Sequence, residues 1–156
     1  MSRFSRSCAA VLEDIRHPDQ TAAVVVGTAT GAAESPATIA SELAGRWPNT
    51  DVHLVSAGVE TVPASLLEAI ALLRRYEVLS WVVVDLHPGA ELVGAFTLAN
   101  ETPGRRLSLS RLAEPAQPPA RHLNPCAAVL SLGAARRDES VSIKVGRWSV
   151  ALATTS

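Results

Sequence analysis

Three residues of this sequence could act as an acid, a base or a nucleophile: Asp85, His87 and Cys126. Asp85 and His87 follow the apolar run 81–84, which is typical of a buried strand, and open α/β sheets bind ligands beyond the carboxyl ends of such strands. A carboxylate and an imidazole at that place could transfer protons as an acid-base pair. Because Asp-Leu-His-Pro-Gly (85–89) is also an ordinary turn composition, we favour a turn.

Cys126 follows Asn124-Pro125 at the entrance to an apolar run. A nucleophilic cysteine needs a nearby base, and usually a helix N-terminus, to lower the pKa of its thiol. Neither is visible around this residue, so the sequence favours a buried, inert thiol.

A glycine turn follows the first apolar run and comprises Gly27, Thr28, Ala29, Thr30 and Gly31. Free backbone amides at the start of a helix attract phosphate, so this turn could cradle an anion. Its spacing matches neither GxGxxG nor GxxxxGK[ST], and no lysine follows. We favour the alternative, that the glycines let a tight turn close against a neighbouring strand.

A second turn lies where such folds usually hold a nucleophile, and it contains no cysteine: Ser56, Ala57, Gly58, Val59, Glu60 and Thr61. Ser56 is not in a G-x-S-x-G elbow, because Leu54 stands where the first glycine belongs, so a serine hydrolase is disfavoured. Glu60 could join Asp85 and His87, but it is equally placed to favour the start of the following helix.

Strands alternating with helices must position these turns, which predicts a layered α/β fold with a mostly parallel central sheet. Strands are expected at 22–26, 52–56, 81–84 and 91–99, an edge strand over 107–112, a hairpin of 127–132 with 141–145, and a last strand at 148–153. Helices are expected over 7–16, from Ser35 to about Gly45, and from Thr61 or Val62 onward, where a stripe should be buried: Leu66, Leu67, Ile70 and Leu73. We expect a helical arm over 1–20 and one α/β domain over 21–156.

The composition and net charge of the 156-residue chain argue against several classes of function. Fourteen basic residues against fifteen acidic ones, a formal net charge of −1, argue against a nucleic-acid partner. The four histidines and two cysteines show no metal-ligand spacing, so no metal or other cofactor is expected. With no signal peptide and no membrane span, and with two widely separated cysteines, we expect a cytoplasmic protein. A hydrophobic content of 47% predicts that many apolar side chains are buried in a core, in a subunit interface, or in both.

Three stretches resemble β-ketoacyl synthases: AAVVVGTATGAAES (22–35), DVHLVSAGVETVPASLLEAIALLRRYEVLSWVVVDLHPG (51–89) and NPCAAVLSLGAARRD (124–138). The order of elements over roughly 20–150 resembles the ketosynthase-like N-terminal domain of the thiolase-like superfamily. That resemblance implies a cysteine at the tip before the long helix, where this sequence has Ser56–Thr61. It also implies a longer segment before the nucleophile strand, where only Arg46–Thr50 stands, and a second half of the fold beyond the end of this chain.

The resemblance therefore predicts a ketosynthase-like subunit without condensing activity of its own. Such a subunit would bind a ketosynthase or an acyl carrier protein in polyketide or fatty-acid biosynthesis, or form a homodimer. Two alternatives stay open. One is a small α/β hydrolase like the hydrogenase maturation proteases, although no acidic residue follows the first strand until Glu34. The other is a residual acyltransferase that uses Cys126.

Overall fold

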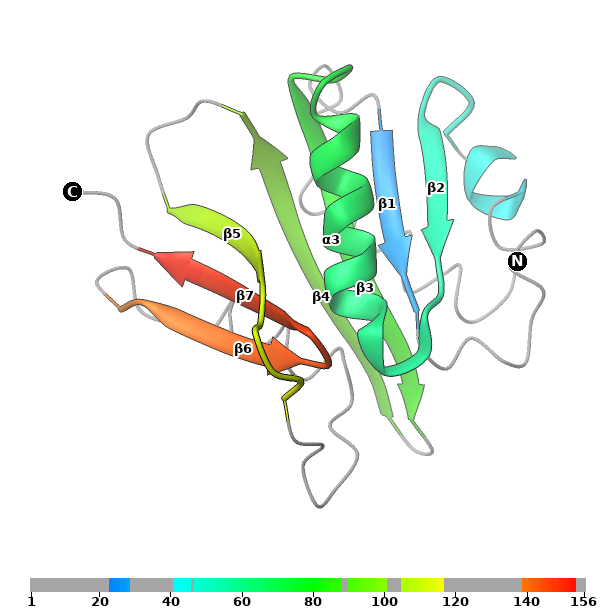
Figure 1. The fold of residues 1–156 in the computed structure, drawn as a ribbon. Helices are drawn as coiled ribbons and strands as arrows, with labels where there is room; N and C mark the ends of the chain where they lie inside the picture. Colours follow the sequence, from blue (N-terminus) through cyan, green and yellow to red (C-terminus); the bar gives the residue numbers. More distant parts are fainter. Residues whose placement is uncertain are drawn as a thin grey trace.

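The computed structural model of this chain describes residues 23–28, 41–45, 47–87, 90–100, 105–116 and 139–153, with 85–87 and 90–93 described through their backbone only. Its main sheet has four strands: β1 (Ala23–Gly27), β2 (Asp51–Val55), β3 (Val78–His87) and β4 (Ala90–Ala99). They lie in the order β2-β1-β3-β4 (Figure 1). β1 is parallel to both of its neighbours, and β4 is antiparallel to β3. The predicted mostly parallel sheet is confirmed for these strands.

β1 is buried at all five positions. Its run of three valines explains this, because a central parallel strand is covered on both faces and needs apolar side chains at every position. The register places Gly27, the last residue of β1, opposite Val55 of β2 and Val83 of β3. The carboxyl ends of the three parallel strands therefore meet at one edge of the sheet.

Helix α3 (Thr61–Leu72) connects β2 to β3 and follows a single 3-10 turn, η1 (Gly58–Glu60). It lies across one face of the main sheet (Figure 1). Pro63 in its first turn needs no hydrogen-bonding partner for a backbone N–H, which suits a helix start. The helix buries Val62, Leu66, Ala69 and Leu72 against the sheet.

A second, antiparallel sheet is formed by β5 (Arg106–Arg111), β6 (Val141–Val145) and β7 (Trp148–Ala153), in the order β5-β7-β6. Alternate side chains of these strands join Val150 and Leu152 in the core around α3. The hairpin between β6 and β7 turns through Gly146-Arg147, with Gly146 at φ +56°. Because Arg147 does not share this positive φ, the turn is of type II′, whose twist matches that of its strands.

The main sheet therefore has two cores. On one face, α3 and the second sheet cover β1, β3 and β4. On the other face, a smaller cluster gathers around Leu43, in the helical segment 41–45, together with Val24, Val26, Val82 and Val84. Helices on opposite faces are what the strand-helix alternation of the sequence predicts.

A buried hydrogen bond fixes α3 to the sheet. The indole Nε1 of Trp81 on β3 donates to Oγ of Ser65 at 2.9 Å, and Ser65 Oγ donates to the carbonyl of Val62 at 3.1 Å. Trp81 also stacks on Phe96 of β4, with ring centroids 5.5 Å apart. On the opposite side of Ser65, a Cβ added to Gly27 would lie 2.8 Å from the serine Oγ, so this strand needs glycine there for the helix to approach.

Most predicted elements are confirmed within one or two residues, including the first strand, the second strand and a long helix that begins at Thr61. The third strand is longer than predicted, since β3 runs from Val78 to His87. The predicted buried stripe is wrong for Leu67 and Ile70, which are 49% and 41% exposed. The predicted helix 7–16 and the predicted strand 127–132 lie outside the described residues. Within the described part of the chain, no helix has the length and apolarity that crossing a membrane requires.

We expect Ser65→Ala to lower the free energy of unfolding by about 1–3 kcal/mol, because it leaves the buried Trp81 N–H without its acceptor. Urea denaturation measures the change, with Ser56→Ala, at an exposed serine, as the matched control. Equal denaturation midpoints for the two variants would show that this bond does not hold the helix in place.

Candidate functional site

The two turns that the sequence singles out lie side by side at the carboxyl edge of the main sheet. The N–H of Thr28, just after β1, donates to the carbonyl of Val55 at the end of β2 at 3.0 Å. Gly27 faces the first turns of α3, close to Thr61 and Ser65. The two turns meet because parallel strands bring their carboxyl ends to one edge of the sheet. Thr30 and Gly31 lie outside the described residues.

The turn Ser56–Thr61 is closed by its own hydrogen bonds. The N–H of Ala57 donates to Oγ1 of Thr61 at 3.1 Å, and the Thr61 hydroxyl donates to the carbonyl of Gly58 at 2.7 Å. The N–H of Glu60 donates to the carbonyl of Ala57 at 3.1 Å. Gly58 takes a φ of +57°, a left-handed conformation that favours glycine. The Thr61 hydroxyl is therefore engaged in holding the turn and is buried, so it is not presented as a nucleophile.

The surface of this turn is apolar at its tip. Val59 is 65% exposed, and Ser56, Ala57 and Gly58 are exposed beside it. Glu60 is partly exposed and its side chain lies against Gly146, in the turn between β6 and β7. An exposed apolar tip is suited to contact with another molecule rather than to proton transfer.

The turn predicted at Asp85 and His87 is wrong. Both residues belong to β3, where Asp85 is paired with Leu92 and His87 with Ala90 of β4. The antiparallel pairing of β3 with β4 continues to His87 and Ala90. β3 therefore extends beyond the end of β1 as part of a two-stranded ladder. Cys126, the other candidate for chemistry, lies outside the described residues.

Two buried hydroxyls on the main sheet have no hydrogen-bond partner within the part of the chain described. They are Oγ1 of Thr28, in the glycine turn, and Oγ of Ser80, in the interior of β3. A buried hydroxyl without a partner at the carboxyl edge of a sheet would fit an anion cradle, the alternative that the sequence disfavours for this turn. Ser80 is paired with Val24 inside the sheet, away from that edge, so the feature is not special to the turn and does not by itself indicate a ligand.

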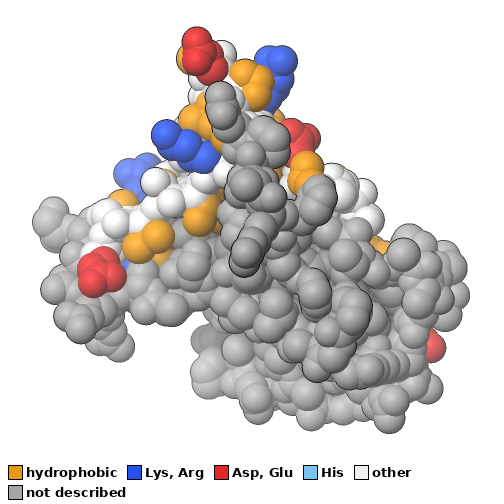
Figure 2. All heavy atoms as spheres, turned by 90° about the horizontal axis from the view of Figure 1, so that it is seen from below, with side chains coloured by type: hydrophobic (Ala, Val, Ile, Leu, Met, Phe, Trp, Pro, Cys, Tyr) orange, Lys and Arg blue, Asp and Glu red, His pale blue; other side chains and the backbone are white. Residues whose placement is uncertain are grey.

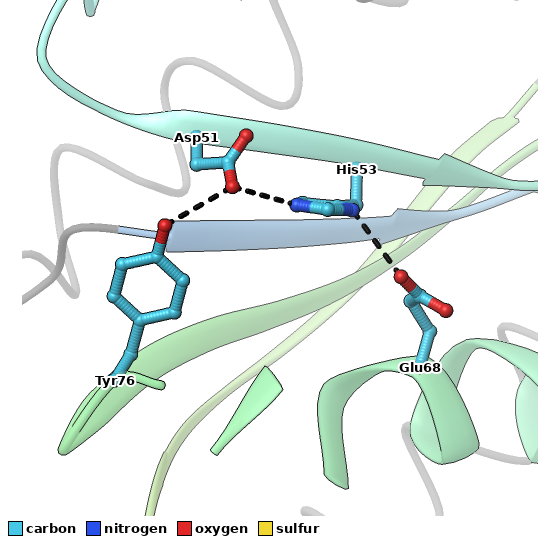
Figure 3. A network of polar contacts seen from close by, with 4 residues as sticks. All are labelled: Asp51, His53, Glu68 and Tyr76. Carbon is cyan, nitrogen blue, oxygen red and sulfur yellow. Dashed lines mark hydrogen bonds and ion pairs between the residues drawn. The ribbon is translucent and has the colours of Figure 1, made fainter. Parts of the chain in front are cut away.

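A polar network that the sequence analysis missed joins β2 to α3 (Figure 3). Nε2 of His53 lies 2.9 Å from Oδ2 of Asp51, and Nδ1 of His53 lies 3.2 Å from Oε1 of Glu68. The phenol of Tyr76, in the segment after α3, donates to the same Asp51 oxygen at 3.1 Å. The network lies on the half-exposed surface at the amino ends of the strands, opposite the two turns.

The network shifts the titration of two of its members. The hydrogen bond from His53 is the main reason that the pKa of Asp51 is lowered from its ordinary value of 3.8. The bond to Asp51 in turn raises the pKa of Tyr76 from its ordinary value of 10.0, because it stabilises the protonated phenol. The guanidinium of Arg75 lies 5.7 Å from the centre of the Tyr76 ring and is the remaining charge at this place.

The role of this network is structural, because it joins β2 to α3. Both ring nitrogens of His53 face carboxylates, and a neutral imidazole has only one N–H, so both contacts are hydrogen bonds only when the ring is protonated. The alternation of Asp51 and His53 along a strand could have signalled that they share a face, but their meeting with Glu68 and Tyr76 depends on the tertiary fold.

Among the described residues, no group of three or more histidine, cysteine, aspartate or glutamate side chains is arranged to hold a metal ion. A scan against protein-family models finds no family that matches this chain, and a search of curated proteins finds no relative. The candidate site is therefore defined by its geometry alone, as the closed turn 56–61 and the helix that follows it.

The raised pKa of Tyr76 can be measured directly, because the chain contains a single tyrosine. We expect tyrosinate absorbance to rise with a midpoint above pH 10.0 in the wild type and closer to 10.0 in Asp51→Asn, which lacks the carboxylate charge. Glu114→Gln, at an exposed glutamate in the segment after β5, should keep the wild-type midpoint. Identical midpoints in the wild type and in Asp51→Asn would contradict the hydrogen bond.

The lowered pKa of Asp51 predicts that the folded protein loses stability as the pH falls into the acid range. Because the carboxyl binds its proton more weakly in the folded protein, the ionised form stabilises the fold above pH 3.8, and this contribution is lost as the pH falls through the lower, folded-state value. Asp51→Asn should therefore melt below the wild type at neutral pH and approach it in acid. Thermal unfolding at several pH values measures the difference, which should be absent for Glu114→Gln; a gap that stays constant with pH would rule out the ionised carboxylate as its cause.

Proposed function

We propose that this chain is a ketosynthase-like subunit without condensing activity of its own, which binds a ketosynthase or an acyl carrier protein in polyketide or fatty-acid biosynthesis. The central sheet with α3 on one face would then correspond to half of a thiolase-like fold. The encounter would take place in the cytoplasm.

The closed turn 56–61 is the single observation that carries this proposal. The β2–η1–α3 unit has the strand-turn-helix form from which condensing enzymes present their cysteine, but its tip has no thiol, and its one buried hydroxyl, Thr61, holds the turn together. Removing a covalent nucleophile typically costs about 10⁴–10⁶-fold in rate, which binding groups alone do not replace.

The exposed groups around the turn favour docking. Val59 at the tip and Leu67 on the outer side of α3 are large apolar side chains that face solvent. Apolar groups that the fold does not bury are enriched where one protein contacts another. The turn and the helix that the resemblance associates with catalysis would thus serve in this chain as a contact surface.

The proposal is tested by mixing the purified chain with the ketosynthase and the acyl carrier protein encoded in the same genome, and measuring complex formation by size-exclusion chromatography with light scattering. We expect a complex, and we expect Val59→Asp to weaken it by about fivefold or more, as for a side chain near the centre of an interface. Lys144→Glu, at an exposed position of β6, is the control and should leave the affinity unchanged.

A second measurement separates docking from chemistry. After incubation of the chain alone with an acyl thioester, intact-mass analysis should show no covalent adduct. An acyl adduct that forms and turns over, or the absence of a complex with either partner, would overturn the proposed function.

A further inference from the structure

Charged side chains of both signs lie among apolar ones on the described surface that Figure 2 shows. The polar network of Asp51, His53, Glu68 and Tyr76 differs from these, because its members contact one another across three segments of the chain (Figure 3). At its centre, the imidazole of His53 lies between two carboxylates. Histidine is the side chain whose charge ordinarily changes between about pH 5 and 8, so the network contains a group that responds to pH in this range.

The two contacts of His53 make different demands on its ring. Nε2 lies 2.9 Å from Oδ2 of Asp51, on the same strand, and this contact is a hydrogen bond. Nδ1 lies 3.2 Å from Oε1 of Glu68, on α3, and this contact is an ion pair that requires a protonated ring. A neutral imidazole carries one N–H, so it donates to only one of the two carboxylates. Its other nitrogen then turns a lone pair toward a carboxylate oxygen, and the two repel each other.

The contact with Glu68 is the one that a neutral ring gives up. Asp51 is held on a second side, because the phenol of Tyr76 donates to the same carboxylate oxygen at 3.1 Å. Within the described part of the chain, the side chain of Glu68 has His53 as its only hydrogen-bonding or ion-pairing partner. This side chain is also 42% exposed, so it can turn into water when the ring loses its charge.

The other described groups around His53 keep the same charge over this range. The residue in register with it on β1 is Val25, which is apolar. In the segment after α3, Tyr76 and the guanidinium of Arg75 both interact with Asp51. The pKa of Asp51 is lowered from 3.8 and that of Tyr76 is raised from 10.0, so neither group changes its charge between pH 5 and 8. The response of the network to pH in this range therefore rests on the imidazole.

We propose that His53 is a pH-dependent link between β2 and α3, in which the protonated ring joins the two elements through Glu68 and the neutral ring stays with Asp51 and releases α3. Because the ion pair needs the proton, the link stabilises the fold at the acid end of the range and is lost as the pH rises. The turn 56–61 connects β2 to α3, so the link joins the two elements that carry this turn. The inference goes beyond the proposed function, because the link needs no partner protein.

A double-mutant cycle at two pH values tests the link in the full chain. Urea denaturation is measured for the wild type, His53→Ala, Glu68→Ala and the double variant, at about pH 5.5 and about pH 8.5, on either side of ordinary histidine titration. At the lower pH, the midpoint of the double variant should fall by about 0.1–0.5 M less than the sum of the two single losses, as for a half-exposed ion pair. At the higher pH, the two losses should add. The other histidines cancel, because all variants are compared at the same pH.

The hydrogen bond between Tyr76 and Asp51 supplies the matched control. Neither of its members changes charge between these two pH values, so the cycle of Tyr76→Phe and Asp51→Ala should give a similar coupling at both. His53 and Glu68 are both partly exposed, so their alanine variants should keep the circular dichroism spectrum of the wild type.

A coupling between His53 and Glu68 that is absent at the lower pH, or that is as large at the higher pH, would overturn the inference. Either result leaves the proposed function in place, because docking at the turn 56–61 is measured with a ketosynthase or a carrier protein and the link is measured on the chain alone. Conversely, a coupling with the expected dependence on pH would stand even if neither partner bound.

Discussion

The close approach of α3 to the main sheet is the contact on which the rest of this structure depends. Ser65 lies between Gly27 of β1 and Trp81 of β3, and it accepts the indole hydrogen bond in a fully buried position. A side chain larger than glycine at position 27 would meet the helix, and a helix residue without a hydroxyl at 65 would leave the tryptophan N–H unpaired. Contacts of this one small polar group therefore join α3 to both β1 and β3.

The sequence predicts the parts of this fold that rest on local chemistry. The three valines of β1 indicate a strand that is buried on both faces, and Pro63 sets the start of α3 to within a residue. The meeting of the turns after β1 and β2 follows from their being parallel neighbours. The close pairing of Trp81 with Ser65 has no local signal, because it depends on how the helix crosses the sheet.

The predictions that failed did so where tertiary context decides. Asp85 and His87 have a turn composition, but the ladder with β4 holds them extended. Ile70 falls at helical spacing from both Leu66 and Leu67, yet only one side of α3 faces the sheet, and a sequence window this short does not show where the buried side ends. Tyr76 meets Asp51 across 25 residues, a distance that no pattern of spacing in the chain indicates.

The polar contacts at the two edges of the main sheet differ, and this difference bears on the proposed function. At the amino edge, the contacts of His53 with Asp51 and Glu68 tie β2 to α3. At the carboxyl edge, the turn 56–61 satisfies its own polar groups and exposes Val59. Between these edges α3 exposes Leu67 and Ile70, although neither contributes to the core that the opposite side of the same helix builds. Exposed apolar side chains do not stabilise the isolated fold and promote association, so their concentration on one helix and on the turn before it is the reason that we propose a contact with another protein there.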